Sequence, residues 1–221
     1  MITQERLLTI NEVADLCEKV GADVHAIAKG MGLDNRIGRT FLHPGPGYGG
    51  SCFPKDTRAI LEVAREHGED LKIVSAAVSV NDRRPEQMVR KIKETIGDLR
   101  GSAIGLLGLS FKPNTDDIRE SAAVSIARSL TQAGATVRAY DPVAMQGARE
   151  QGLEDVFCDN EYEAAAGADA LVLATEWNQF RSLDFERLHS VMRRPVLIDL
   201  RNVYASSEVR ARGFQYTGIG R

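Results

Sequence analysis

The stretch SAIGLLG at residues 102–108, followed by LSFK at residues 109–112, marks the point where the character of the chain changes. Residues 102–108 form a short apolar run that ends in polar residues and Pro113, as expected of a buried strand. From here onward, short apolar runs alternate with segments of helical character. Strands that alternate with helices are typical of a parallel sheet covered by helices. The sequence therefore predicts an α/β domain that begins near this stretch.

The elements on either side of this stretch divide the chain into two regions. After residues 102–108 we expect strands at residues 136–140, 155–158, 170–174, 196–199 and 214–218, with helices near residues 120–133, 143–151, 161–166, 184–192 and 206–212. Before residue 99 no strand pattern is found. We therefore predict an N-terminal helical region at residues 1–98 and a doubly wound parallel-sheet, Rossmann-like domain at residues 99–221, with a linker near residues 98–101.

The helical region carries two further signals. Apolar residues surround so much of the predicted helix at residues 4–20 that we expect it to pack on two sides, which fits contact with another subunit. Gly21 should end this helix, and Asp23 should cap a short helix that runs through Ala28. Residues 70–97 are helical again, and Pro85 is expected either to break this run or to open a second helix.

Composition excludes several classes of protein. The 221 residues are 43% hydrophobic and 27% charged, which is ordinary for a soluble globular protein. The net charge of -3 argues against a nucleic-acid binder, and no apolar run or signal-peptide pattern indicates a membrane protein or a secreted one. The three cysteines, Cys17, Cys52 and Cys158, have no metal-ligand spacing, so we expect neither a metal site nor disulfides. A cytoplasmic location is expected.

The segment GPGYGGSCFPKD at residues 45–56 is the strongest candidate site. Its glycines allow a ligand to approach the backbone closely, because no Cβ atoms stand in the way. Pro54 is compatible with a first helical turn, which places Cys52 at a helix N-terminus. Free N–H groups, the helix dipole and Lys55 all favour a thiolate there, and Asp56 adds a carboxylate one turn beyond the sulfur. The alternative is a buried, inert cysteine, which the polar neighbours make less attractive.

Polar groups also follow three of the predicted strands. Lys112, with Arg119 in the same loop, follows the first strand, Asp141 ends the second, and Arg201 leaves the end of a late strand. Ligands of doubly wound folds bind beyond the carboxyl ends of the strands, and two basic groups there suit a nucleotide diphosphate. The glycines of residues 105–108 lack the G-x-G-x-x-G spacing, so they are only a weak dinucleotide signal.

These motifs resemble the UDP-glucose/GDP-mannose 6-dehydrogenase family over the full chain. The segment GPGYGGSCFPKD resembles the catalytic-cysteine motif of that family, and its GPGYGG form with Phe53 favours the UDP-glucose 6-dehydrogenase branch. Four further segments resemble the C-terminal domain of the family: GLSFKPNTDDIRE at residues 108–120, AYDP at residues 139–142, TEW at residues 175–177 and DLRN at residues 199–202.

The resemblance implies a two-step oxidation of the C6 hydroxyl of the sugar to a carboxylate, with two molecules of NAD+. Cys52 would be the catalytic nucleophile that forms a thiohemiacetal and then a thioester. Asp56 would order or deprotonate the water that hydrolyses the thioester. Lys55 and Arg119 would lie on the cofactor side, with Arg119 near the NAD diphosphate.

The resemblance also implies where the UDP-sugar binds. The loop of residues 43–49 would lie under the nucleotide, Phe111, Lys112 and Arg201 would reach it from the α/β domain, and Arg36 would reach the site of a neighbouring subunit. The first helices would then form a homodimer. The expected substrate-binding residues are Arg36, Phe41, His43, Gly45, Gly47, Tyr48, Gly49, Phe111, Lys112 and Arg201.

The chain departs from the family pattern at its start. Family members begin with an NAD-binding domain of about the size of this chain, and its catalytic lysine and asparagine would lie just before Met1. We therefore expect a C-terminal portion that binds the UDP-sugar and dimerises but is inactive alone, with a separate NAD-binding half as the partner it would need. Two alternatives stay open: a non-catalytic nucleotide-sugar-binding or dimerisation module, and a cofactor-independent cysteine acyl-transfer enzyme.

Overall fold

The computed structural model describes residues 2–153 and 157–221. Residues 2–98 contain the helices α1 (Ile2–Val20), α2 (Val24–Met31), α3 (Cys52–Glu66) and α4 (Lys72–Ile96), and no strand. As predicted, α1 ends where Gly21 adopts a φ of +69°, and the Asp23 carboxylate caps α2 by accepting the N–H of His25. α2 runs one turn further than predicted, to Met31.

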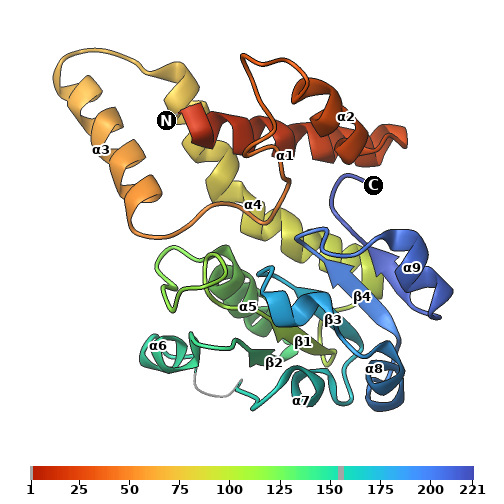
Figure 1. Ribbon diagram of the computed structural model, residues 1–221. Helices are drawn as coiled ribbons and strands as arrows, with labels where there is room; N and C mark the ends of the chain where they lie inside the picture. Colours follow the sequence, from red (N-terminus) through yellow and green to blue (C-terminus); the bar gives the residue numbers. More distant parts are fainter. Residues whose placement is uncertain (1, 154–156) are drawn as a thin grey trace.

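α4 continues through Pro85, so the expected break or second helix at this residue was wrong. A proline inside a helix removes one hydrogen bond and costs about 3 kcal/mol. Both halves of α4 nevertheless bury side chains, among them Ala77 before the proline and Met88 and Ile92 after it. Packing on both sides of Pro85 outweighs the local penalty, and α4 therefore runs unbroken from the helical region down to the sheet (Figure 1).

The described residues between 99 and 221 form a five-stranded parallel sheet with the strand order β2-β1-β3-β4-β5. The strands are β1 (Ala103–Leu107), β2 (Thr136–Tyr140), β3 (Ala170–Leu173), β4 (Val196–Asp199) and β5 (Gln215–Thr217). Each coincides with a predicted strand to within one residue at either end. The strand predicted at residues 155–158 lies partly outside the described residues, and Phe157 makes a single parallel bridge to Ala139.

Helices cover both faces of the sheet, as the doubly wound α/β prediction requires. Because strand side chains alternate, Ile104 and Leu106 of β1 face one core and Leu107 faces the other. α4, α5 (Ala122–Gln132) and α6 (Met145–Glu150) contribute to the first core, whereas α7 (Glu161–Ala165), α8 (Phe185–Val191) and α9 (Ser206–Ala211) contribute to the second. A short 3-10 helix, η2 (Asn178–Arg181), follows β3.

The two regions of the chain share packing. The first core continues from the sheet into the helical region, where Ile10, Ala14 and Cys17 of α1 belong to it. The C-terminal segment also joins the two, because Gly220 accepts the N–H of Val24 at 2.9 Å (Figure 1). The boundary near residues 98–101 stays a prediction. Among the described residues, no helix combines the length and apolarity that crossing a bilayer requires.

Candidate functional site

The loops that follow β1, β3 and β4 lie at one edge of the sheet and face the loop of residues 41–51. β1 lies between β2 and β3, so the strand order reverses beside it. In doubly wound folds the crevice at such a reversal is the usual ligand site. Loops carrying Phe111, Lys112, Glu176 and Arg201 leave this edge, as the sequence predicted for three of these residues.

Asp141, directly after β2, organises this edge. Its side chain is fully buried, and Oδ2 accepts bonds from the N–H groups of Leu109 (2.7 Å) and Ser110 (3.0 Å), from Ser110 Oγ (2.8 Å) and from Trp177 Nε1 (3.1 Å). Oδ1 accepts two more backbone N–H groups, at 3.0 and 2.9 Å. Burial alone would raise the pKa of Asp141, but the backbone donors more than offset burial and lower the pKa. Asp141 thus fixes the loops after β1 and β3.

The glycine-rich loop packs directly against the loop after β1. A Cβ on Gly49 would lie 2.4 Å from the carbonyl oxygen of Glu120, and one on Gly50 would lie 2.8 Å from the Phe111 ring. Gly50 has a φ of +85°, and its N–H donates to the carbonyl of Arg119 at 2.8 Å. Glycine is therefore required at both positions for the two loops to touch.

Arg58 of α3 adds an ion pair to this contact between the loops. Its two terminal nitrogens lie 3.0 and 3.1 Å from the carboxylate oxygens of Glu120. Both side chains are about half exposed, so the pair contributes little stability but links α3 to the sheet edge.

Cys52 is the first residue of α3, as predicted, and its side chain is exposed. Its Sγ lies 3.7 Å from the hydroxyl of Ser51. Asp56 follows one turn later on the same face of the helix, and its carboxylate lies 3.6 Å from Nζ of Lys55. The pKa of Arg119 is raised, chiefly by its hydrogen bond to Asp117 and to a lesser extent by the charge of Cys52. A thiol, a carboxylate and two cations therefore gather at the start of α3.

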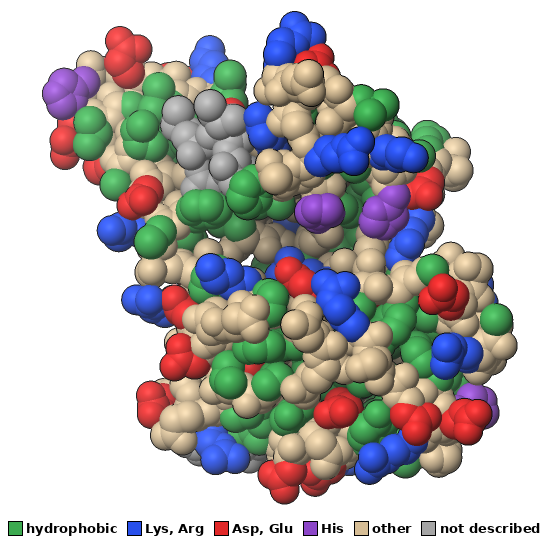
Figure 2. All heavy atoms as spheres, in the orientation of Figure 1, with side chains coloured by type: hydrophobic (Ala, Val, Ile, Leu, Met, Phe, Trp, Pro, Cys, Tyr) green, Lys and Arg blue, Asp and Glu red, His purple; other side chains and the backbone are tan. Residues whose placement is uncertain are grey.

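A hollow of about 430 Å³ lies between the helical region and the sheet edge, and we call it the crease hollow. Three of the residues assigned to substrate binding line it together: Phe41, His43 and Arg201. His25, Glu176 and Arg181 also line it, although the sequence did not identify them as site residues. Figure 2 shows basic side chains on both sides of the crease between the two regions, histidines on its upper side and an acidic side chain among the basic ones on its lower side. The basic groups favour an anionic ligand.

Arg201 is held in place at the floor of the crease hollow. Its Nε donates to the carbonyl of Ala174 at 2.9 Å and lies 2.9 Å from Oε2 of Glu176, while Nη2 donates to the carbonyl of Phe111 at 3.2 Å. Nη1 lies 3.1 Å from the position that a Cβ of Gly45 would occupy, so it points at the glycine-rich loop. This guanidinium therefore bridges three strand-end loops to the loop of residues 45–50.

Asp199, at the end of β4, sets the backbone that carries Arg201. One carboxylate oxygen accepts the N–H of Arg201 (3.1 Å), and the other accepts the N–H of Tyr204 (2.9 Å) and the hydroxyl of Tyr216 (3.1 Å). Burial raises the pKa of Asp199, and these donors oppose only part of that effect. DLRN thus works as a unit in which the aspartate supports the arginine.

None of the other predicted substrate-binding residues, all of which the structure describes, lines the crease hollow. Lys112 is exposed, with Nζ 5.3 Å from the centre of the Phe111 ring. Arg36 lies on the surface, where its guanidinium pairs with Asp34 at 2.6 Å and lowers the pKa of that carboxyl. Its predicted role in a neighbouring subunit stays a prediction. Gly47 and Tyr48 lie in the glycine-rich loop that precedes Cys52.

The sheet edge does not fit a dinucleotide such as NAD. Asp141 stands where such a fold places its ribose-binding acid, yet it is buried and bonded to the neighbouring loops. The turn after β1 also lacks the G-x-G-x-x-G spacing. Lys55 and Arg119 are exposed cations near Cys52, and their place on the cofactor side stays a prediction. In the described part of the chain, no group of three or more His, Cys, Asp or Glu side chains is arranged to hold a metal ion.

Comparison with known proteins matches both regions of the chain to one family. Residues 2–83 match the UDP-glucose/GDP-mannose dehydrogenase family, central domain, and residues 105–206 match the UDP binding domain of the same family. A UDP-glucose 6-dehydrogenase from Rhizobium meliloti (strain 1021) is 55% identical over 218 residues, which are 98% of this chain and 50% of the relative. The chain spans about half the length of the curated relatives it matches.

Solved structures agree with this match. A UDP-glucose dehydrogenase from Pyrobaculum islandicum superposes with a TM-score of 0.87 at 36% identity, covering 99% of this chain and 48% of that one. An NDP-N-acetyl-D-galactosaminuronic acid dehydrogenase from Methanosarcina mazei Go1 gives a TM-score of 0.87 at 30% identity, with coverages of 99% and 48%.

Proposed function

Because this chain belongs to the UDP-glucose/GDP-mannose dehydrogenase family, whose members are NAD-dependent oxidoreductases, we propose that it binds a UDP-sugar and presents Cys52 to C6 of the sugar. The observation that carries the proposal is the crease hollow, where Phe41, His43 and Arg201 from distant parts of the sequence meet beside the cysteine-bearing loop. The GPGYGG form of the loop and Phe53 favour UDP-glucose as the sugar nucleotide.

In this proposal the basic groups of the sheet edge bind the diphosphate. Arg201 is already oriented by two carbonyls and Glu176, so it loses little freedom when it binds an anion. Lys112 extends from the same edge as a mobile point charge. The backbone of residues 45–50 then lies under the nucleotide, where glycine permits close approach.

Cys52 and Asp56 would carry the chemistry on this chain. The thiolate of Cys52 adds to the carbonyl carbon of the C6 aldehyde, so a C–S bond forms and the oxygen takes up a proton, giving a thiohemiacetal. Asp56, one helical turn away, accepts a proton from the water that hydrolyses the acyl-enzyme. NAD+, when bound, supplies the hydride acceptor for the oxidations. Lys55 and Arg119 would stabilise negative charge on the cofactor side of the sulfur.

A homodimer through the helical region belongs to the same proposal. Leu16 and Val20 of α1 are 59% and 65% exposed, which leaves one apolar side of that helix uncovered. A second subunit packed there would bring an exposed Arg36 within reach of a neighbouring site. Sedimentation equilibrium on the chain and on Leu16→Glu tests this part, and a wild-type monomer at micromolar concentration would contradict it.

Calorimetric titration with UDP and UDP-glucose tests the binding proposal. Charge-assisted hydrogen bonds contribute about 1.5–3 kcal/mol, so Lys112→Ala and Arg201→Ala should each weaken binding roughly tenfold or more. Lys93→Ala and Arg90→Ala, which remove exposed charges on α4, are the matched controls and should bind as the wild type does. Unchanged affinity in both site variants would remove the diphosphate assignment.

A further inference from the structure

The backbone of the glycine-rich loop is bonded by side chains of the central helices. The N–H of Gly45 donates to Oδ1 of Asn11 at 2.8 Å, and its carbonyl accepts Nε of Arg84 at 3.2 Å. The N–H of Tyr48 donates to Oδ1 of Asn81 at 2.8 Å, and Nδ2 of Asn81 donates back to the Tyr48 carbonyl at 3.1 Å. Gly45 and Tyr48 belong to no strand or helix, yet the backbone N–H and C=O groups of both are hydrogen-bonded by side chains of α1 and α4.

Two of the side chains that make these hydrogen bonds, Asn11 and Arg84, are buried. Asn11 is 3% exposed and Arg84 is fully buried, although both are polar residues. Gly47, between the two bonded residues, has a φ of +122°, and a Cβ there would lie 3.0 Å from Oδ1 of Asn81. The loop conformation and the amide of Asn81 therefore fit each other closely. A buried polar side chain without its partner is costly, so the loop has few alternative positions.

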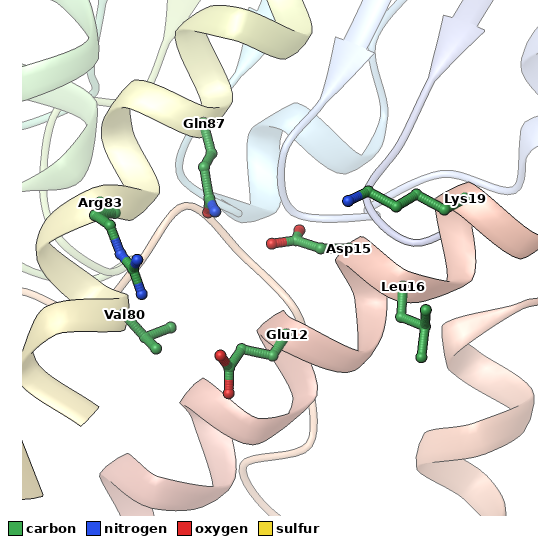
Figure 3. A pocket seen from close by; sticks show the side chains of 7 residues that line it. All are labelled: Glu12, Asp15, Leu16, Lys19, Val80, Arg83 and Gln87. Atoms are coloured by element: carbon green, nitrogen blue, oxygen red, sulfur yellow. The ribbon is translucent and has the colours of Figure 1, made fainter. Parts of the chain in front are cut away.

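The other side of Arg84 reaches the space between α1 and α4. Its Nη1 donates to Oδ1 of Asp15 at 2.6 Å and to Oε1 of Gln87 at 2.9 Å. Asp15 and Gln87 project from the two helices into a hollow of about 260 Å³ (Figure 3). The Arg84 guanidinium therefore ties both helices to the Gly45 carbonyl, and the position of the loop depends on how the two helices are held.

We propose that Asn11, Asn81 and Arg84 are positioning residues that hold the loop of residues 45–50 in its ligand-binding conformation, an inference that rests on the proposed UDP-sugar site. None of them lines the crease hollow, and each acts through loop backbone. Pre-ordering the loop removes the entropy loss that a mobile glycine-rich segment would otherwise suffer on binding. Supporting contacts of this kind keep a binding site within the geometry its ligand needs.

Two variants of Asn81 test this role, because Asn81 is only half-buried and replacement should leave the fold intact. Asn81→Leu removes both bonds to Tyr48, and Asn81→Asp keeps an acceptor for the N–H but loses the donor to the carbonyl. Amide exchange at residues 45–50 and UDP affinity by calorimetry are measured for each. Gln132→Leu, which replaces an exposed amide at the end of α5, is the control.

We expect Asn81→Leu to speed exchange at Tyr48 at least tenfold and to weaken UDP binding about tenfold, with α1 and α4 exchanging as in the wild type. For Asn81→Asp, both the exchange rate at Tyr48 and the UDP affinity should lie between those of Asn81→Leu and the wild type. Gln132→Leu should match the wild type in both. Wild-type affinity in Asn81→Leu, or exchange that rises equally along α1 and α4, would refute the positioning role alone. A wild-type chain that does not bind UDP would refute the proposed function and this role with it.

Discussion

Replacing Gly49 by alanine tests the contact between the glycine-rich loop and the loop after β1. The new Cβ would lie 2.4 Å from the Glu120 carbonyl oxygen, 3.0 Å from the Glu120 carbonyl carbon and 3.1 Å from Cβ of Phe111. The first two atoms are backbone and cannot rotate away, so the loops must separate and strain the Gly50–Arg119 hydrogen bond. Overpacking costs about 1–3 kcal/mol, and the weakened bond adds about 1 kcal/mol.

A loss of about 2–4 kcal/mol corresponds to a fall in Tm of roughly 5–15 °C for a chain of this size. Calorimetry measures that fall, and UDP titration should show weaker binding because Phe111 is displaced. Gly30→Ala is the matched control: apart from its chain neighbours and the backbone of α2 itself, no atom lies within 4 Å of its added Cβ, and alanine inside α2 should stabilise by about 0.5–1 kcal/mol. A Gly49→Ala variant that melts and binds like the wild type would refute the close contact of the two loops.

Three further predictions concern stability. Asp141→Asn should lower the free energy of unfolding in urea at pH 7 by at least about 3 kcal/mol, because the amide nitrogen cannot accept the hydrogen bonds that one carboxylate oxygen accepts. Since the folded pKa of Asp141 is lowered, this difference should hold above about pH 4 and disappear as the pH falls through the folded pKa, and a difference independent of pH would contradict it. Gly105→Ala should cost about 1–3 kcal/mol, because its Cβ would lie 2.7 Å from the Ala164 carbonyl oxygen, and a neutral result would mean that α7 packs less closely on β1. Arg58→Ala should lower the free energy of unfolding by less than about 1 kcal/mol, and by less still in high salt, because the ion pair with Glu120 is half exposed. A larger loss would mean that this pair contributes substantially to stability.

Much of the sheet was predictable from local patterns. Strands at residues 103–107 and 196–199 are short apolar runs, and the strand at residues 136–140 alternates buried apolar side chains with more exposed ones. Glycine, proline or aspartate bounds these strands, and such signals do not depend on distant residues. The position of Cys52 at the start of α3 was predictable for the same reason, because Pro54 and the glycines determine the local backbone. The resemblance of GPGYGGSCFPKD and DLRN then supplied roles that periodicity could not.

The residues that hold the site together carry no comparable local signal. Arg84 lies beside Arg83 on the same helix, yet Arg84 is fully buried while Arg83 is exposed. The difference is explained by bonding partners of Arg84 that are distant in the sequence, the Gly45 carbonyl and the Asp15 carboxylate. His25 and Arg181 line the crease hollow for the same reason, since tertiary packing alone brings them there. Pro85 shows the opposite case: this proline predicted a break or a new helix, but packing on both sides of it keeps α4 continuous.

The central claim is that a UDP-sugar binds against the loop that carries Cys52. Cys52 is the exposed thiol, whereas Cys17 and Cys158 are buried and burial raises the pKa of Cys158. Iodoacetamide should therefore modify Cys52 first, and mass spectrometry can follow that rate with and without ligand. We predict that saturating UDP-glucose slows alkylation of Cys52 at least tenfold, and that Arg201→Ala raises the ligand concentration needed by about the same factor. An alkylation rate at Cys52 that UDP-glucose leaves unchanged would contradict the account.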